Sequence, residues 1–139
     1  MSDKRYTISL RTTHPTKSAK WMEEAIGQVA RRSRSVGEIR IAPGGRALDV
    51  NRESCCDFNV LPVQRGAFTF GVASAAVMLS HHERAFARIR EEGGVAELFV
   101  RVFIDDASNT AFALEPALMS RLVTLGLRLS LDVSLEERQ

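Results

Sequence analysis

The feature that most limits what this chain can fold into is the strict alternation of residues 95–104, VAELFVRVFI. One set of alternate residues is entirely apolar, whereas the other mixes charged residues with two phenylalanines. A period of two, rich in β-branched and aromatic residues, predicts a long strand with one face in the core. The core-facing set is Ala96, Leu98, Val100, Val102 and Ile104, and the opposite set is Val95, Glu97, Phe99, Arg101 and Phe103.

The residues after this strand predict a tight return, a short helix and another strand. The Asp, Ser and Asn residues at 105–109 are typical of a turn, and residues 110–114 are expected to return as the second strand of a hairpin. A helix is predicted between Pro116 and Gly126, because proline suits the first helical position and glycine the left-handed end. Residues 127–133, LRLSLDV, alternate without exception and predict a strand with its apolar residues facing inward.

The N-terminal part of the chain predicts a strand followed by a capped helix. Residues 6–13, YTISLRTT, alternate between apolar and polar side chains. His14 precedes a proline and is expected to be a loop residue where this strand ends. Thr16 or Ser18 is expected to cap the following helix, which Gly27 ends.

The middle of the chain is the least regular part. Short strands are expected near 29–35 and 38–42, followed by a loop that contains a Pro-Gly-Gly turn. Residues 55–62 predict a strand that Pro62 ends, because proline cannot donate a hydrogen bond to a sheet.

Residues 68–92 have apolar side chains at helical spacing, and the glycines at 93 and 94 are expected to end the helical region. The Ser-His-His-Glu sequence at 80–83 matches a capping box, so a second helix is expected to start there. The whole order of elements predicts one α+β domain over residues 1–139, with an extended antiparallel sheet and helices mainly on one face. Its first six elements follow the β-α-β-β-α-β order of a ferredoxin-like α/β sandwich.

Composition agrees with an ordinary globular domain. The chain has 139 residues, of which 45% are hydrophobic and 26% charged, enough for one self-sufficient core. No apolar run approaches the roughly 20 residues of a membrane helix. The first 14 residues lack the apolar core of a signal peptide, so we expect a cytoplasmic protein with no membrane partner.

The chain offers few groups for catalysis or metal binding. Cys55 and Cys56 are adjacent on a predicted strand, so they are expected to point to opposite faces as two free thiols, one of them buried. His81 and His82 face about 100° apart on a helix and are poorly placed to share one metal. The two aspartates at 105–106 belong to the predicted turn. We predict no metal site, no cofactor and no catalytic residue, while the sequence leaves open a triad that is assembled only in space.

Several stretches together resemble a known family. They are Gly27 with the Arg- and Ser-rich residues after it, Gly37, Pro43-Gly44-Gly45-Arg46, Asn51-Arg52-Glu53-Ser54, residues 93–100, and Leu114 through Asp132. With these stretches the chain resembles the bacterial domain-of-unknown-function family numbered 4279. The resemblance implies a compact α+β domain of about this length and implies no activity. Where the family often has a Tyr-Trp pair after Glu-Ser, this chain has the two cysteines.

Arginines are concentrated early in the chain. Residues 1–52 contain 11 Lys and Arg against 5 Asp and Glu, whereas residues 53–139 contain 8 against 12. The densest group is Arg31, Arg32 and Arg34, where strand alternation is expected to separate Arg31 from the other two. A solvated strand, an acidic protein partner and nucleic acid all fit such a group. Nucleic acid ranks last, because few aromatic side chains lie nearby to stack on bases.

A second candidate surface is the sheet face away from the helices. Strand phasing places on it Thr7, Ser9, Arg11, Glu97, Phe99, Arg101, Phe103, Arg128, Ser130 and Asp132. Two large aromatic residues among charges of both signs are typical of an interface core with a polar rim. Phe99, Arg101, Phe103 and Arg128 are therefore candidate binding residues for a second copy in a homodimer or for another protein.

These observations favour a non-enzymatic binding or interaction module, of which an immunity-type protein is one form. The alternative is a small-molecule or nucleic-acid binder that uses the basic region 31–52, and an enzyme ranks third.

Overall fold

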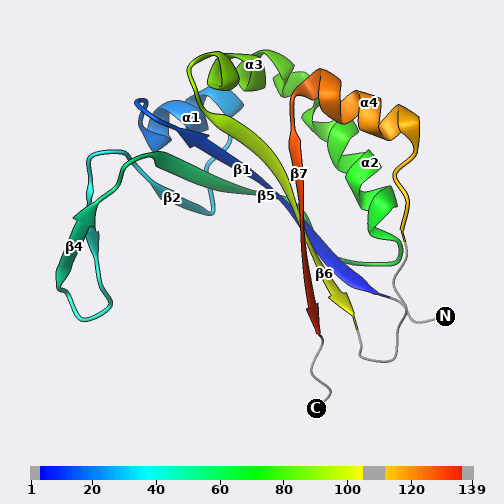
Figure 1. Ribbon diagram of the computed structural model, residues 1–139, viewed down its shortest axis with the longest axis horizontal. Helices are drawn as coiled ribbons and strands as arrows, with labels where there is room; N and C mark the ends of the chain where they lie inside the picture. The colour runs from blue at the N-terminus through cyan, green and yellow to red at the C-terminus, as the bar shows by residue number, and fades with distance from the viewer. Residues whose placement is uncertain (1–3, 105–111, 136–139) are drawn as a thin grey trace.

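In the computed structural model, which describes residues 4–104 and 112–135, the chain forms a mixed α and β fold (Figure 1). The elements, in chain order, are β1 (Arg5–His14), α1 (Ala19–Ile26), β2 (Arg32–Arg34), β3 (Ile39–Ile41), β4 (Ala47–Val50), β5 (Ser54–Arg65), α2 (Phe68–Leu79), the 3-10 turn η1 (Ser80–His82), α3 (Glu83–Glu91), β6 (Val95–Ile104), α4 (Pro116–Leu125) and β7 (Arg128–Leu135). The α+β class predicted from the sequence is confirmed.

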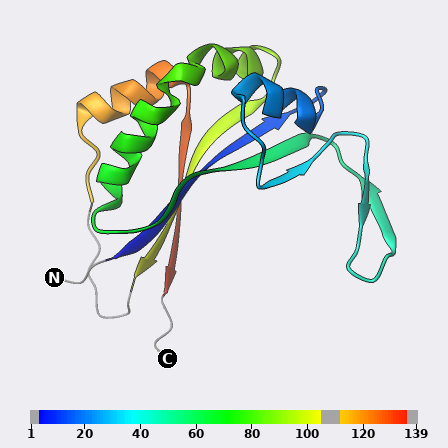
Figure 2. The ribbon, with the colours of Figure 1, turned by 180° about the vertical axis from the view of Figure 1, so that it is seen from behind.

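One sheet of five strands organises the described residues, in the order β2-β5-β1-β6-β7. Strand β1 pairs antiparallel with both β5 and β6, and β2 pairs antiparallel with β5. Strand β7 pairs parallel with β6. The short strands β3 and β4 pair with each other as a separate hairpin, which projects beyond one end of the sheet (Figures 1 and 2).

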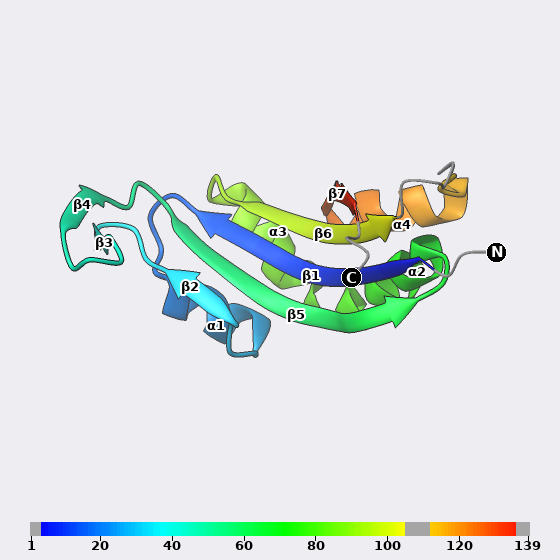
Figure 3. The ribbon, with the colours of Figure 1, turned by 90° about the horizontal axis from the view of Figure 1, so that it is seen from below.

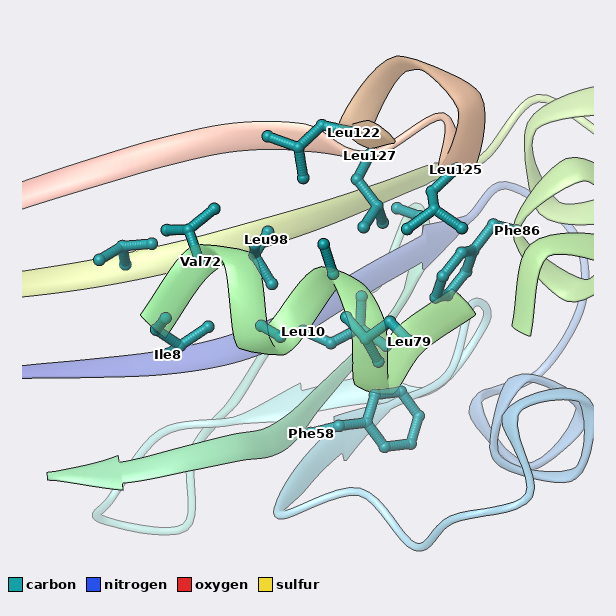
Figure 4. Close-up of a cluster of buried hydrophobic side chains, with 14 of the residues drawn as sticks. Ile8, Leu10, Phe58, Val72, Leu79, Phe86, Leu98, Leu122, Leu125 and Leu127 are labelled. Carbon is teal, nitrogen blue, oxygen red and sulfur yellow. The ribbon is translucent and has the colours of Figure 1, made fainter. Parts of the chain in front are cut away.

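The helices of the described chain cover one face of the sheet, and Figure 3 looks onto the other face with the strands in front. The core fills the space between the sheet and the helices. Figure 4 shows its fully buried side chains, among them Ile8, Leu10, Phe58, Val72, Phe86 and Leu98. Burying one such side chain stabilises the fold by roughly 1.5–3 kcal/mol. The predicted phases of β1 and β6 are therefore confirmed, since their apolar residues from Ile8 to Leu10 and from Ala96 to Val102 point into this core.

Helix α1 begins and ends where the sequence predicts. The Ser18 hydroxyl accepts a hydrogen bond from the Trp21 backbone N–H at 3.1 Å, which satisfies one of the free donors of the first turn. Gly27 ends the helix in the left-handed conformation, with a φ of 78° that favours glycine. Met22 and Ile26 are buried against the sheet.

The expectation of a wholly antiparallel sheet is wrong at one edge. Helix α4 carries the chain back along the helical layer, so β7 enters the sheet in the same direction as β6 and pairs with it in parallel. Both edges of β6 are then occupied, by β1 and β7, and no hairpin partner is needed. Residues 112–114 of the expected return strand form no strand, and the predicted turn at 105–109 lies outside the described residues.

Two further strand predictions are corrected. Strand β5 continues through Pro62 to Arg65 instead of ending at the proline. The register between β1 and β5 shifts around Ile8 and Leu61, so Pro62 lies in an irregular stretch where its missing N–H costs the sheet less. The expected loop after residue 42 contains strand β4, because a tight turn at Gly45 folds it back onto β3.

The capping box predicted at residues 80–83 is not formed. The Ser80 hydroxyl donates its hydrogen bond backwards to the Val77 carbonyl at 2.6 Å, and residues 80–82 form a 3-10 turn. Helix α3 starts at Glu83 without a side-chain cap. The break between two helices near residue 80 is nevertheless where the sequence predicts it.

Candidate functional site

The sheet face without helices, here called the open face, is crossed by one row of alternating charge. The strand registers place Arg32, Asp57, Arg11, Glu97 and Arg128 side by side across all five strands. In each strand, alternate side chains point to the open face. Because these five residues are aligned by the strand register, their side chains form a row across the sheet. Opposite charges on directly facing residues stabilise neighbouring strands.

Two hollows lie side by side on the open face, one of about 650 Å³ and one of about 420 Å³. They adjoin each other because Arg11 and Arg32 line both. The structure brings all seven of the candidate binding residues to these two hollows. They are Arg31, Arg32, Arg34, Phe99, Arg101, Phe103 and Arg128. The two surfaces that the sequence suggests separately are therefore one surface.

The prediction that Arg31 is separated from Arg32 and Arg34 is wrong. Arg31 precedes β2, so strand alternation does not govern its side chain. Its backbone N–H donates to the Asp57 carbonyl at 2.7 Å, and its guanidinium donates to the Asp57 carboxylate at the same distance. This double contact holds Arg31 beside the open face.

Guanidinium groups stack on both phenylalanines of the open face. The centre of the Arg11 guanidinium lies 3.6 Å from the centroid of the Phe99 ring, and that of Arg101 lies 5.8 Å from it. The Arg5 guanidinium lies 5.2 Å from the Phe103 ring centroid. Each such contact is worth about 0.5–1 kcal/mol at an exposed site. The rings are thereby held in place and remain partly exposed.

Charge on the open face is only partly balanced. Arg101 pairs with Asp132 at 3.2 Å, while Glu97 accepts a hydrogen bond from the Ser130 hydroxyl at 2.8 Å. Arg128 approaches Glu97 to 4.0 Å. Among the described residues, six arginines but only three acidic residues line the two hollows. The hollows therefore carry an excess of positive charge.

The rest of the basic region 31–52 continues from this surface toward the hairpin of β3 and β4. A third hollow, of about 320 Å³, adjoins the larger one because Arg34 and Glu53 line both, and Arg40 and Arg52 also line it. Arg40 pairs with Asp49 at 3.1 Å on the hairpin formed by β3 and β4, which belongs to a separate sheet. Arg46 is exposed just before β4. The structure thus places Arg31, Arg32 and Arg34 on the open face, and the hollow lined by Arg34, Arg40 and Arg52 connects them to the arginines at the hairpin.

Sequence alternation places Arg11 on the open face without marking it as a binding residue, and it does not place Asp57 there. Arg11 is central because β1 is the middle strand, and Asp57 because it receives Arg31. The signal for Asp57 is its place between Cys56 and Phe58, which are both buried on the core side. To use that signal, one must know which residues of β5 face the core. The two adjacent cysteines do not reveal this, because one of them faces each side of the sheet.

The two cysteines lie on opposite faces as free thiols, as predicted. Cys56 is buried, and this burial raises the pKa of its thiol to about 11, which keeps it protonated and unreactive. Cys55 lines the larger hollow beside Glu53. Within the described residues no three His, Cys, Asp or Glu side chains gather as a metal site. The aspartates at 105–106 lie outside the described residues.

His14 is a structural residue, which corrects its prediction as a loop residue. It is the last residue of β1 and is fully buried, because it joins three segments. Its Nδ1 accepts hydrogen bonds from the backbone N–H groups of Thr16 and Lys17, at 3.1 and 2.9 Å. An Nδ1 that accepts two bonds leaves Nε2 to carry the proton, and Nε2 lies 3.0 Å from the Glu92 carboxylate. Both ring nitrogens of His14 therefore form hydrogen bonds within the protein.

The contact between His14 and Glu92 makes stability depend on pH. Burial acts to raise the pKa of Glu92, but the hydrogen bonds from His14 and Arg88 outweigh it and hold the pKa below its ordinary value of 4.5. A lowered pKa adds stability that is complete above that value and is lost as the pH falls through the folded-state pKa. We expect Glu92→Gln to unfold at lower urea concentration than the wild type at pH 7, and the difference to shrink at pH 3.

The matched control for this prediction is Glu91→Gln, which removes the same charge from the exposed neighbouring residue. Urea titrations of the three proteins at pH 7 and pH 3 make the comparison. A difference between wild type and Glu92→Gln that is the same at both pH values contradicts the assigned role of Glu92.

Comparison with known proteins identifies no relative: no family model, curated protein or solved structure matches the chain. The resemblance to the family numbered 4279 therefore stays a prediction. Among the described helices, none combines the length and the apolar character needed to cross a membrane.

Proposed function

We propose that this protein is a non-enzymatic binding module that holds an acidic protein partner against its open face. One observation carries the proposal: all seven candidate binding residues line two adjoining hollows on the sheet face that none of the described helices covers. Antiparallel sheets commonly leave one face in water, and that face is then usually polar throughout. The two partly exposed phenylalanines depart from that pattern.

The mixture of side chains on the open face favours a protein partner. Phe99 and Phe103 offer apolar surface, and arginines surround and stack on them. Aromatic residues and arginine are the types enriched in protein interfaces and in their energetic hot spots. The stacked arginines lose little freedom when a partner binds, because the rings already hold them.

The charge of the open face favours an acidic partner over a second copy. Of the residues that the structure describes, six arginines against three acidic residues line the hollows, so two copies of this face would meet with like charges. A partner with surface carboxylates would meet complementary charge instead, and arginine pairs well with carboxylates because two N–H groups donate in parallel. The homodimer through this face that the sequence suggests is therefore the less favoured form of the proposal.

The test compares retention of partners on immobilised wild type with retention on two open-face variants, Phe103→Glu and Arg32→Glu. The matched control is Arg84→Glu on α3, which reverses an exposed charge on the helical side. We expect a protein that the wild type and Arg84→Glu retain and that both open-face variants lose. With the purified pair, each open-face change should weaken affinity at least about tenfold, and added salt should weaken it further.

Circular dichroism of each variant shows whether the fold is intact. Equal retention on all four proteins contradicts the proposal. A Phe103→Glu protein that unfolds means that the open face is covered from within the chain, which also contradicts it.

A second candidate function is binding of nucleic acid or of a small anion at the larger hollow. The observation that favours it is that Arg11, Arg32 and Arg34 form no ion pair with another described residue, although they line the same hollow. If the retained molecule is nucleic acid, its affinity should fall steeply with salt as counterions are released. The low number of aromatic residues on the face ranks this candidate second.

A finer description of the fold belongs to the same proposal. The order β2-β5-β1-β6, with antiparallel neighbours, supports a ferredoxin-like arrangement to which α4 and β7 add a parallel edge. We propose on the sequence resemblance that the chain belongs to the family numbered 4279 and acts in the cytoplasm. A toxin gene adjacent to the gene for this chain would support an immunity-type form of the binding module, and a metabolic operon would speak against it.

A further inference from the structure

Helix α2 has an apolar outer side that the rest of the described chain does not cover. Its twelve residues, FTFGVASAAVML, include no charged side chain. One side packs in the core, but Phe70, Val77 and Met78 on the outer side are 76%, 54% and 50% exposed. A helix that is apolar all round is normally buried. The outer side of α2 is therefore a surface that favours a partner, since no other described part of the chain covers it.

A groove runs between α2 and α4 along this outer side. The α2–α4 groove has a volume of about 490 Å³, and Phe70, Ala73 and Val77 line one wall while Leu118 lies on the other. Its charged side chains are Glu115 and Arg121, both from the α4 side. Neither forms an ion pair with another described residue.

The two helices run in the same general direction along the groove (Figures 1 and 2). The Phe68 ring at the start of α2 contacts the Phe112 ring just before α4, with centroids 4.8 Å apart. Glu115 therefore lies at the end of the groove near Phe70, and Arg121 lies toward the end near Val77. The groove thus has a negative end and a positive end.

We infer that the occupant of the α2–α4 groove is a second copy of this chain, related to the first by a two-fold axis. In an antiparallel pair of α2 helices centred between Ala73 and Ser74, Phe70 of each copy faces Val77 of the other. The small residues at the centre allow the helices to approach, and the large residues at the ends fill the grooves. Such a self-complementary pattern is what a two-fold interface requires.

The charges fit the same arrangement. A two-fold axis that brings Phe70 against the partner's Val77 also brings the negative end of one groove to the positive end of the other. Glu115 then meets the partner's Arg121, and each dimer has this pair twice. Opposite charges at an interface rim set the register and suppress other arrangements.

This dimer goes beyond the proposed function and does not depend on it. The α2–α4 groove lies on the helical side, so both open faces stay free and point away from the interface (Figures 1 and 3). A dimer with two free binding faces engages a repeated or dimeric partner with an avidity that one copy lacks.

The test measures molar mass by light scattering during size exclusion, together with sedimentation equilibrium over a range of concentrations. We expect a wild-type mass of twice 15.4 kDa. Phe70→Glu should raise the dissociation constant of the dimer about thirtyfold or more, because a hot-spot contact is replaced by a buried charge. Val29→Glu is the matched control, since Val29 is also exposed and apolar but lies away from the groove.

A charge exchange makes the test specific to the proposed register. Glu115→Arg alone and Arg121→Glu alone should each weaken the dimer, because like charges then meet. The double variant Glu115→Arg with Arg121→Glu should recover most of the lost affinity, which a general effect on folding does not explain.

A wild type that stays monomeric at several hundred micromolar overturns the inference. So does a dimer that survives Phe70→Glu and is lost in Phe103→Glu, because that result moves the interface to the open face. Failure of the partner-binding experiment on the open face leaves these measurements unaffected, so the two proposals stand or fall separately.

Discussion

Replacing Leu98 with alanine should lower the free energy of unfolding by about 2–5 kcal/mol, whereas the same change at Leu129 should cost clearly less. Leu98 is 0% exposed on β6 and lies between Leu10 and Leu129 in the strand register. Truncating it removes apolar contacts and leaves a cavity that the close-packed sheet and helices do not refill. Leu129 points to the same side, but it belongs to the edge strand β7 and is only partly buried.

The two leucines are matched in residue type, direction and register, so they isolate the effect of position in the sheet. Urea denaturation of both variants, with a check that the slope of the transition is unchanged, supplies the comparison. If only the alternation along each strand mattered, the two variants would lose the same free energy of unfolding. A loss at Leu129 as large as that at Leu98 means that something covers β7 which the described residues do not include.

Gly94→Ala should destabilise the protein by about 3 kcal/mol, at the upper end of the cost of overpacking. A Cβ at this position would overlap the Thr13 carbonyl oxygen and lie 2.7 Å from Ile89 Cγ2. The carbonyl belongs to the backbone of the central strand β1, so it has no flexible end that can move aside. The glycine is needed because the turn from α3 into β6 passes directly against β1.

Gly44→Ala is the control for this change. Gly44 lies in the turn of the projecting hairpin, and a Cβ there meets no heavy atom within 4 Å. The free energy of unfolding of the Gly44→Ala variant should stay within about 0.5 kcal/mol of the wild-type value. Thermal and urea unfolding of both variants provide the measurement, and a Gly94→Ala protein as stable as the Gly44→Ala protein contradicts the close approach of the turn to β1.

Local pattern was sufficient to predict several elements of this protein. The alternation in β1 and β6 predicts which side chains enter the core, because successive residues of a strand must point to opposite faces. Ser18 and Gly27 predict the two ends of α1, because a cap and a left-handed glycine act within a few residues of themselves. These choices depend on steric limits and hydrogen bonds between near neighbours, which the sequence alone contains.

The candidate site was predictable only in part. Alternation assigned Phe99, Arg101, Phe103 and Arg128 to one face, and the structure places them there. Their meeting with Arg31, Arg32 and Arg34 depends on the order β2-β5-β1-β6-β7, which brings strands together that are far apart in the chain. No local pattern encodes that order.

Tertiary structure alone decided the remaining features. The crossover through α4 makes β7 parallel to β6, and its place at the edge leaves Leu129 partly exposed. A shift of register between β1 and β5 admits Pro62 into a strand. His14 is buried because Glu92, far along the chain, supplies a partner for its ring. In each case the free energy comes from contacts between distant residues, and those contacts exist only once the strands and helices have assembled.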